Sequence, residues 1–309
     1  MNNKLLVLGT IAYDAIETPF GKTGKILGGC ATYIGLAASN FKTSCGLVSI
    51  IGSDFESAHW ELLKKKKLDL TGVETLEGEK TFFWSGKYHN DLNTRTTLET
   101  QLNVLTKFEP KVPENFKDAS IVLLGNLDPN IQMEVLRQMS KKPDLVVMDT
   151  MNFWIESYRE KLDELIGKVD VISINDEEAR QLTGKHSLVE SAKLIQTLGP
   201  KYVIIKKGEH GALLFHENKI FCAPGLPLEE VFDPTGAGDS FIGGFSAYLS
   251  QCGKISFEEM KTAIIIGSAL ASFTVQEFGT TALEKISFTQ LAQRIKTFKR
   301  LTEFEIELT

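Results

Sequence analysis

The sequence predicts an α/β protein in which helices cover both faces of a mainly parallel central sheet. Short apolar runs rich in valine and isoleucine alternate with amphipathic segments, and these runs are apolar throughout. Unbroken apolar strands are typical of parallel sheets that are buried on both faces. No linker rich in proline, glycine and serine divides the 309 residues, so we expect a single domain over residues 1–309.

Strand and helix candidates alternate along most of the chain. Apolar runs predict strands at 5–9, 46–51, 121–125, 145–149, 169–174 and 202–205. The spacing of apolar residues predicts helices at 131–139, 187–198 and 257–276. A further helix is expected to begin within the glycine-rich stretch DPTGAGDSFIGGF at 233–245.

Residues 76–100 interrupt this alternation. β-forming residues around Phe82, Phe83 and Trp84 are followed by a polar turn at 89–91 and then by threonines. We expect an antiparallel excursion that forms a small β lid together with residues at about 11–27. Such a lid also offers a surface for a homodimer.

Composition and charge disfavour several classes of protein. The 34 basic and 40 acidic residues are interspersed and give a net charge of −6, so no nucleic-acid partner is expected. Polar residues and a glycine interrupt the apolar segment 263–275, so no membrane span is expected. The 4 cysteines form no C-x-x-C pair, which argues against a zinc site or a disulfide framework and favours the cytoplasm.

The glycine-rich stretch is suited to hold an anion. Gly236 and Gly238 let successive backbone N–H groups point to one place, and the helix that follows adds the positive end of its dipole. Asp239 would lie beside a bound phosphoryl group, where its carboxylate could accept the proton of an attacking hydroxyl. The alternative is that Asp239 only complements the first helical turn.

The same stretch resembles the signature D-x-T-G-A-G-D of the ribokinase family, the carbohydrate and nucleoside kinases of the phosphofructokinase B type. The match comprises Asp233, Thr235 and all of 236–239. The resemblance implies a ribokinase-like three-layer α/β/α fold with a small β lid. It also implies an anion hole formed by Gly236, Ala237 and Gly238, with Asp239 as the catalytic base.

On the acceptor side, a pair of glycines opens a predicted helix in LGGCATYIGLAASNF, residues 27–41. Glycine lets a polyol lie against backbone N–H groups, although close packing of the helix on the sheet is the alternative. By the resemblance, Asp14 accepts hydrogen bonds from sugar hydroxyls, and Tyr33 stands where many members have an asparagine. Two asparagines after strand ends could contact substrate or could be turn residues. The expected substrate contacts are Asp14, Gly28, Gly29, Tyr33, Asn126 and Asn152.

On the nucleotide side, Asn175 and Glu178 match the N-x-x-E motif of the family, which organises hydrated Mg²⁺ and the phosphates. The alternative for such a pair is a capped helix start. The resemblance implies nucleotide contacts from Asn175, Lys206, Gly208, Ser268 and Gly279, with Mg²⁺ held by Glu178 through water. It also implies a monovalent cation site, for K⁺, at Asp233 and Thr235 beside Gly279. For Lys206, the alternative is a solvated surface lysine.

These features predict an ATP-dependent kinase that transfers the γ-phosphoryl group to a hydroxyl of a sugar. A nucleoside kinase of the adenosine type is the alternative, in which Tyr33, Phe82 or Trp84 would stack on the base. A regulator that binds a nucleotide or a sugar without turnover is less favoured, because it would not need Asp239.

Overall fold

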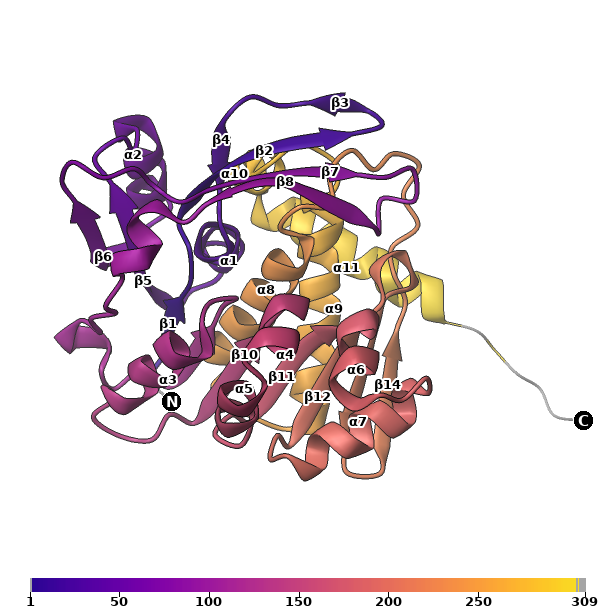
Figure 1. Ribbon diagram of the computed structural model, residues 1–309. Helices are drawn as coiled ribbons and strands as arrows, with labels where there is room; N and C mark the ends of the chain where they lie inside the picture. The colour runs from indigo at the N-terminus through magenta and orange to yellow at the C-terminus, as the bar shows by residue number, and fades with distance from the viewer. Residues whose placement is uncertain (1, 304, 306–309) are drawn as a thin grey trace, which may run out of the picture.

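The computed structural model describes residues 2–303 and 305 and contains a nine-stranded sheet of order β14-β13-β12-β11-β10-β9-β1-β5-β6 (Figure 1). All pairs from β12 to β6 are parallel, and β13 and β14 are antiparallel additions at one edge. The strands are β1 Lys4–Leu8, β5 Ser44–Gly52, β6 Asp69–Leu76, β9 Ile121–Leu124, β10 Leu145–Asp149, β11 Val171–Asn175, β12 Tyr202–Lys206, β13 Ala212–His216 and β14 Lys219–Ala223. The predicted mainly parallel sheet is confirmed.

Strand β1 shows how the helices come to cover both faces. Leu5 and Val7 belong to one apolar core, and Leu6 and Leu8 belong to the other, because successive side chains of a strand point to opposite faces. The first core is completed by α1 Cys30–Ala38, α8 Ala237–Cys252, α9 Phe257–Thr274, α10 Thr281–Lys285 and α11 Phe288–Thr302. The second is completed by α3 Pro129–Arg137, α4 Asn152–Ser157, α5 Arg159–Ile166, α6 Asp176–Thr183 and α7 Leu188–Thr197. The predicted three-layer α/β/α fold is confirmed.

The order of the strands defines a switch point at β1 in the large sheet. Strand β1 pairs with β9 on one side and with β5 on the other, so the chain runs outward from β1 in both directions. Ligands of open α/β sheets bind outside the carboxyl ends of the strands at such a switch point. Asp149, Asn175 and Lys206 are the last residues of three neighbouring strands, β10, β11 and β12.

A second, five-stranded sheet lies across this edge, above the ends of α8 and α9 (Figure 1). Its strands are β2 Ala12–Thr18, β3 Gly21–Lys22, β4 Ile26–Gly28, β7 Phe83–Tyr88 and β8 Arg95–Gln101. Strands β7 and β8 form an antiparallel hairpin, and β2 pairs with β7 in parallel. Phe20 after β2 packs edge-on against Phe232, at 5.7 Å between ring centroids, so the small sheet contacts the chain just before the glycine-rich loop.

Three strands of the large sheet escape sequence analysis. Strand β6 has a polar, half-buried sequence, and β14 is largely exposed, so neither carries the continuous apolar run of a buried strand. Strand β13 follows β12 after a short turn that ends at Gly211. Most predicted boundaries are correct within a few residues: β11 begins at Val171, and α9 ends at Thr274. Helix α2, Ser57–Lys65, lies beyond the parallel edge and contacts β6.

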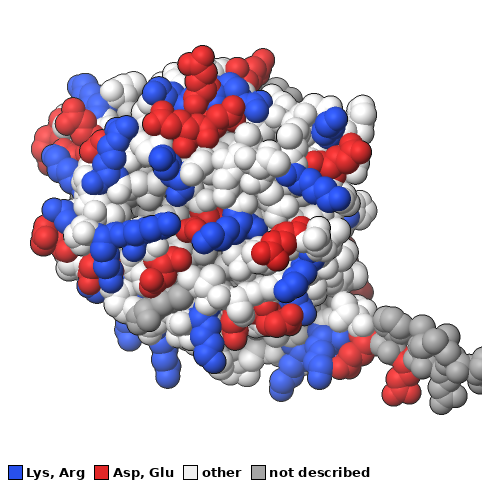
Figure 2. All heavy atoms as spheres, turned by 90° about the horizontal axis from the view of Figure 1, so that it is seen from below, with Lys and Arg blue, Asp and Glu red and all other residues white. Residues whose placement is uncertain are grey.

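The face opposite the small sheet carries both signs of charge. Lysine and arginine side chains alternate there with aspartate and glutamate, without a continuous basic stripe (Figure 2). Within residues 2–303 and 305, no helix combines the length and the apolar character that crossing a membrane requires.

The close approach of α8 to α1 predicts a stability defect in Gly243→Ala. A Cβ at residue 243 would lie 2.7 Å from the Ile34 carbonyl oxygen and 2.8 Å from its Cα, and backbone cannot move aside cheaply. We expect the free energy of unfolding to fall by about 1–3 kcal/mol, measured by urea denaturation. Gly24→Ala is the control, because nothing lies within 4 Å of its Cβ position. Equal stability of the two variants would contradict the close helix contact.

Candidate active site

The glycine-rich loop turns directly into α8. Gly236 is the N-cap residue with φ 74°, a left-handed conformation that favours glycine, and a Cβ there would collide with the ring of Tyr33. The Ala237 N–H donates to the Pro234 carbonyl (3.2 Å), which closes the turn. The first N–H groups of a helix lack intrahelical partners, so this end of α8 can receive an anion. Asp239 lies in the first turn, as predicted.

Lys206 lies against this loop. Its Nζ atom is 3.2 Å from the position that a Cβ on Gly238 would occupy, and it donates a hydrogen bond to Asp149 Oδ1 (3.0 Å). The side chains of Lys206 and Asp149 are only 17% and 9% exposed. The structure therefore brings a largely buried ammonium group to the start of α8, and Lys206 is not a solvated surface lysine.

The pKa values of these groups reflect burial and mutual charge. Burial and then the Asp149 carboxylate raise the pKa of Asp239 to about 7, while Lys206 and Arg95 act against this rise. Burial alone would lower the pKa of Lys206, but Asp149 and then Glu178 outweigh it and hold that pKa above its ordinary value. Asp239 is therefore a carboxyl group whose proton affinity suits exchange near neutral pH.

Asn175 and Glu178 form a reciprocal capping box at the start of α6. The Glu178 N–H donates to Asn175 Oδ1 (2.7 Å), and the Asn175 N–H donates to Glu178 Oε2 (2.8 Å). Glu178 is nevertheless buried, and burial raises its pKa although Lys206 opposes the rise. The capped helix start is real, and it also fixes a buried carboxyl group close to Lys206.

Asp14 and the glycine pair lie on the acceptor side. Asp14 is buried, and burial, followed by the charges of Asp233 and Asp239, raises its pKa to about 7, against the effect of the Gly29 N–H. A Cβ on Gly28 would collide with the Asp14 carboxylate. Gly29 has φ 90°, and a Cβ there would overlap the Thr10 carbonyl. The glycines thus make room for Asp14 and for the tight entry into α1, and their role as substrate contacts stays a prediction.

Tyr33 lies between the two sides of the site. It is 1% exposed, its ring packs on Gly236, and among the described residues its buried hydroxyl has no hydrogen-bond partner. The expectation that Tyr33 offers a stacking face for a base is wrong in this structure, because the ring is covered. Its role as a substrate contact through the hydroxyl stays a prediction.

Asp233 joins the glycine-rich loop to the loop that contains Gly279 by hydrogen bonds. Its carboxylate accepts hydrogen bonds from the N–H groups of Thr235 (2.8 Å) and Gly279 (2.9 Å). It is fully buried, and burial raises its pKa. The Thr235 hydroxyl in turn donates to the hydroxyl of Tyr88 on the small sheet (3.2 Å). Gly279, with φ 61°, is held here by its N–H, and its assignment to the nucleotide stays a prediction.

Two predicted substrate contacts are engaged elsewhere. The side-chain Oδ1 of Asn126 accepts a hydrogen bond from Trp154 Nε1 (2.9 Å), and the Asn152 side-chain amide donates to Gln181 of α6 (2.8 Å). The structure therefore directs these side chains toward α4 and α6. Ser268 is half-buried within α9. Its assignment to the nucleotide stays a prediction.

Gly208 lies next to the turn between β7 and β8 of the small sheet. It has φ 54° in a short 3₁₀ helix, Gly208–His210, and a Cβ there would lie 2.8 Å from Asn93 Oδ1 in the turn between β7 and β8. The predicted nucleotide side and the small sheet are thus in contact across the site.

Asp149 is a site residue that the sequence alone does not predict. The residue ends an apolar run, 145–149, that predicts β10, and an acidic residue at the carboxyl end of a parallel strand is the signal that could have identified it. Its partner Lys206 follows more than fifty residues later, so the pairing becomes visible only once β10 and β12 occupy the same edge.

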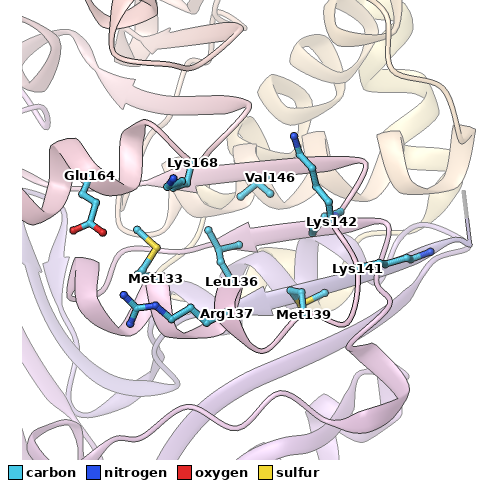
Figure 3. Close-up of a pocket in the computed structure, with 10 residues that line it drawn as sticks. Met133, Leu136, Arg137, Met139, Lys141, Lys142, Val146, Glu164 and Lys168 are labelled. Atoms are coloured by element: carbon cyan, nitrogen blue, oxygen red, sulfur yellow. The ribbon is translucent and has the colours of Figure 1, made fainter.

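A separate pocket of ≈ 430 Å³ lies between α3 and α5 (Figure 3). Its lining includes Lys142, Pro143 and Val146, which precede or begin β10, so it opens at the amino-terminal edge of the sheet. None of the predicted site residues lines it, and we do not include it in the candidate site.

Comparison with known proteins agrees with this geometry. Residues 2–286 match the pfkB family of carbohydrate kinases. The chain therefore belongs to this family, and the predicted ribokinase-family relationship is confirmed. It is an enzyme, a phosphotransferase with an alcohol group as acceptor.

Particular relatives act on different acceptors. The chain is 30% identical over 272 residues to a cytidine kinase of Thermococcus kodakarensis, which covers 84% of this chain and 95% of that protein. It is 28% identical over 299 residues to a ribokinase of Haemophilus influenzae, with coverage of 90% and 94%. A solved structure of a putative ribokinase II of E. coli in complex with ATP and Mg²⁺ superposes with a TM-score of 0.78 at 19% identity, covering 95% and 99% of the two chains.

The two hydrogen bonds to Asp233 predict a stability defect in Asp233→Asn. An amide has one acceptor oxygen and a donor group where the carboxylate has two acceptors, so one of the N–H groups at Thr235 or Gly279 would lose its partner. We expect the free energy of unfolding to fall by about 1–3 kcal/mol in chemical denaturation. Asp128→Asn is the control, since asparagine caps α3 as well as aspartate does. If the two variants lose stability equally, Asp233 does not brace the loops.

Proposed function

We propose that Asp239 accepts the proton of an acceptor hydroxyl while the γ-phosphoryl group of ATP passes to that oxygen at the start of α8. The observation that carries the proposal is the position of the half-buried Asp239, in the first turn of α8 after Gly236, with the Lys206 ammonium group against the same loop. Phosphoryl transfer needs mainly positioning and charge stabilisation, together with a group that takes the hydroxyl proton.

The other groups have roles that follow from their charge. The backbone N–H groups of Gly236 and Gly238 would donate to the oxygens of the transferring phosphoryl group. Lys206, which lies against the loop at Gly238, would balance the negative charge of those oxygens. Lys206 is itself oriented by Asp149, which keeps its ammonium group at the loop. The raised pKa of Asp239 supports proton uptake near neutral pH.

The residues present fit a hydrated Mg²⁺ that arrives with ATP. Among the described residues, no group of three or more His, Cys, Asp or Glu side chains could hold a metal on its own. Mg²⁺ in such sites usually keeps several waters and relies on substrate phosphates and one or two carboxylates, which Glu178 and Asp149 would supply through water. When bound, Mg²⁺ neutralises charge on the phosphates.

A monovalent cation such as K⁺ at Asp233 also belongs to this proposal. The buried carboxylate receives two neutral N–H groups, and no salt bridge within the described part of the chain supplies it with a positive charge. A cation beside Asp233 and Thr235 would offset the cost of burying that charge.

We propose a sugar hydroxyl as the acceptor. Asp14, buried beside Gly28 and Gly29, is suited to accept hydrogen bonds from neighbouring sugar hydroxyls. The small sheet that carries Asp14 lies over the site, and we propose that it acts as a lid that excludes water.

A nucleoside is the second candidate, and Trp84 favours it. Residues 14 and 84 are paired in register between β2 and β7, so both side chains project from the same face of the small sheet. Trp84 is half-buried and its Nε1 donates to Thr97 (3.3 Å), which holds the indole ring in place. A fixed aromatic ring beside a polyol site is a suitable platform for a base, and the cytidine kinase relative supports this candidate.

Two further proposals concern the surroundings of the protein. The four cysteines are free thiols in the structure, which supports a reducing compartment, and we place the protein in the cytoplasm. Strand β8 is almost entirely exposed and lies at the edge of the small sheet, so its backbone could pair with a second copy in a homodimer.

Asp239→Asn tests the base. With MgATP and an accepted sugar or nucleoside, kcat should fall by about 10²–10⁴-fold, measured by coupled ADP detection, because the hydroxyl proton loses its acceptor. In the wild type, kcat/KM should rise with pH up to about 7 and then level off, since Asp239 must be ionised to act. Unchanged phosphotransfer by Asp239→Asn would refute the assignment.

Asp239 and Asp14 both have a pKa of about 7, so two variants are needed to decide which of them causes the fall of kcat/KM at low pH, the acid limb of the profile. Lys206→Met should move the acid limb to higher pH, because Lys206 lowers the Asp239 pKa, in addition to reducing the rate. Asp14→Asn should raise the KM for the acceptor and leave the acid limb in place. A limb that disappears in Asp14→Asn would assign the titration to Asp14 instead.

An acceptor panel distinguishes free sugars from nucleosides. If a nucleoside stacks on Trp84, then Trp84→Leu should lower kcat/KM for nucleosides by about tenfold, the equivalent of ~1.4 kcal/mol of stacking, and should change the value for ribose or fructose little. Turnover of free sugars alone would exclude the nucleoside candidate. No turnover of any acceptor by the wild type would favour a binding protein without catalysis.

A further inference from the structure

We propose that Arg95, at the start of the edge strand β8, contacts the transferring phosphoryl group from the side opposite Lys206. This inference rests on the proposed kinase function and adds a residue of the small sheet to the phosphoryl site. No sequence motif marks Arg95, because the arginine is isolated in a threonine-rich stretch.

The pairing of strands fixes the face on which Arg95 lies. Tyr88 and Arg95 are opposite one another in the antiparallel pair of β7 and β8, and side chains of opposed residues project from the same face. Trp84 and Tyr88 are four residues apart on β7, so they also share a face, and Trp84 shares it with Asp14 on β2. Arg95 therefore lies on the face of the small sheet that carries Asp14.

Contacts on either side of Arg95 place it along the site. The hydroxyl of Tyr88 accepts a hydrogen bond from Thr235, next to the glycine-rich loop. The turn before β8 reaches the nucleotide side, where Asn93 Oδ1 lies 2.8 Å from the Cβ position of Gly208. Arg95 begins β8 between these two contacts, above the phosphoryl position that we assign to the start of α8.

The charge of Arg95 is available for a ligand. The residue is exposed, and within residues 2–303 and 305 no ion pair or hydrogen bond engages its guanidinium group. By contrast, Lys206 is partly neutralised by Asp149. The positive charge of Arg95 lowers the pKa values of Asp239 and Glu178, so its guanidinium group acts on both carboxyl groups of the candidate site.

The chemical step explains why a second cation is useful. The acceptor oxygen forms a bond to the γ-phosphorus as its proton goes to Asp239, and the bond from that phosphorus to the bridging oxygen breaks, so that ADP leaves. Arg95 forms no covalent bond and donates N–H groups to the equatorial oxygens, whose charge must be stabilised during transfer. A planar guanidinium group can reach two such oxygens at once.

The test compares two charge-neutralising variants of the same hairpin, Arg95→Gln and Lys87→Gln. Lys87 is the matched control, because it projects from the opposite face of β7 and pairs there with Glu17 (2.6 Å). With the full-length protein and an acceptor that the wild type phosphorylates, Arg95→Gln should lower kcat by about 10²–10³-fold, with little change for Lys87→Gln. Arg95→Lys should recover part of the loss.

Calorimetric titration with Mg²⁺ and either AMP-PNP or ADP gives a readout that does not depend on turnover. Arg95→Gln should weaken AMP-PNP binding about tenfold and leave ADP binding unchanged, since only the triphosphate analogue carries a γ-phosphate. Equal effects of Arg95→Gln and Lys87→Gln, or equal weakening of both nucleotides, would overturn the inference. If the wild type binds both nucleotides but turns over no acceptor, the proposed function fails, and selective loss of AMP-PNP binding would still support the contact with Arg95.

Discussion

The ammonium group of Lys206 is the charge around which the site is organised. It is largely buried, it is bonded to Asp149, and its charge also acts on Glu178 and Asp239. Buried charges are costly unless they are paired, so three carboxyl groups in this volume require a cation among them. Even with Lys206 in place, Asp239 retains a raised pKa. The same arrangement makes the site receptive to Mg²⁺ and to a proton.

Parallel strand order explains how residues distant in sequence reach Lys206. Strands β10, β11 and β12 are neighbours, and Asn175 is in register with Lys206. Their carboxyl ends meet at one edge, where the amino end of α8 delivers Asp239. The small sheet contributes groups from above, and its hydrogen bond from Thr235 to Tyr88 joins it to the glycine-rich loop. The candidate site is therefore built from two sheets that meet over the start of α8.

The sequence predicts those features that depend on local pattern. Continuous apolar runs predict most of the buried strands, and the stretch at 233–239 predicts the helix start that has Asp239 in its first turn. Asp149 and Arg95 are not predicted from the sequence, because their positions at the candidate site depend on strand order and on register, which no local pattern encodes. Tyr33 is misjudged as a stacking surface for a related reason: its ring is covered by Gly236, more than two hundred residues away. The polar strand β6 lacks the apolar signal on which strand prediction relies.

The central claim is that Asp239 and the start of α8 face the acceptor hydroxyl and the γ-phosphate at the same time. The most direct measurement is a crystal structure of the protein with AMP-PNP, Mg²⁺ and an accepted sugar or nucleoside. We expect one acceptor hydroxyl at about 2.6–3.2 Å from an Asp239 carboxylate oxygen, with the γ-phosphate at the amides of the glycine-rich loop. An acceptor bound away from Asp239, or a triphosphate that ends elsewhere, would contradict the account.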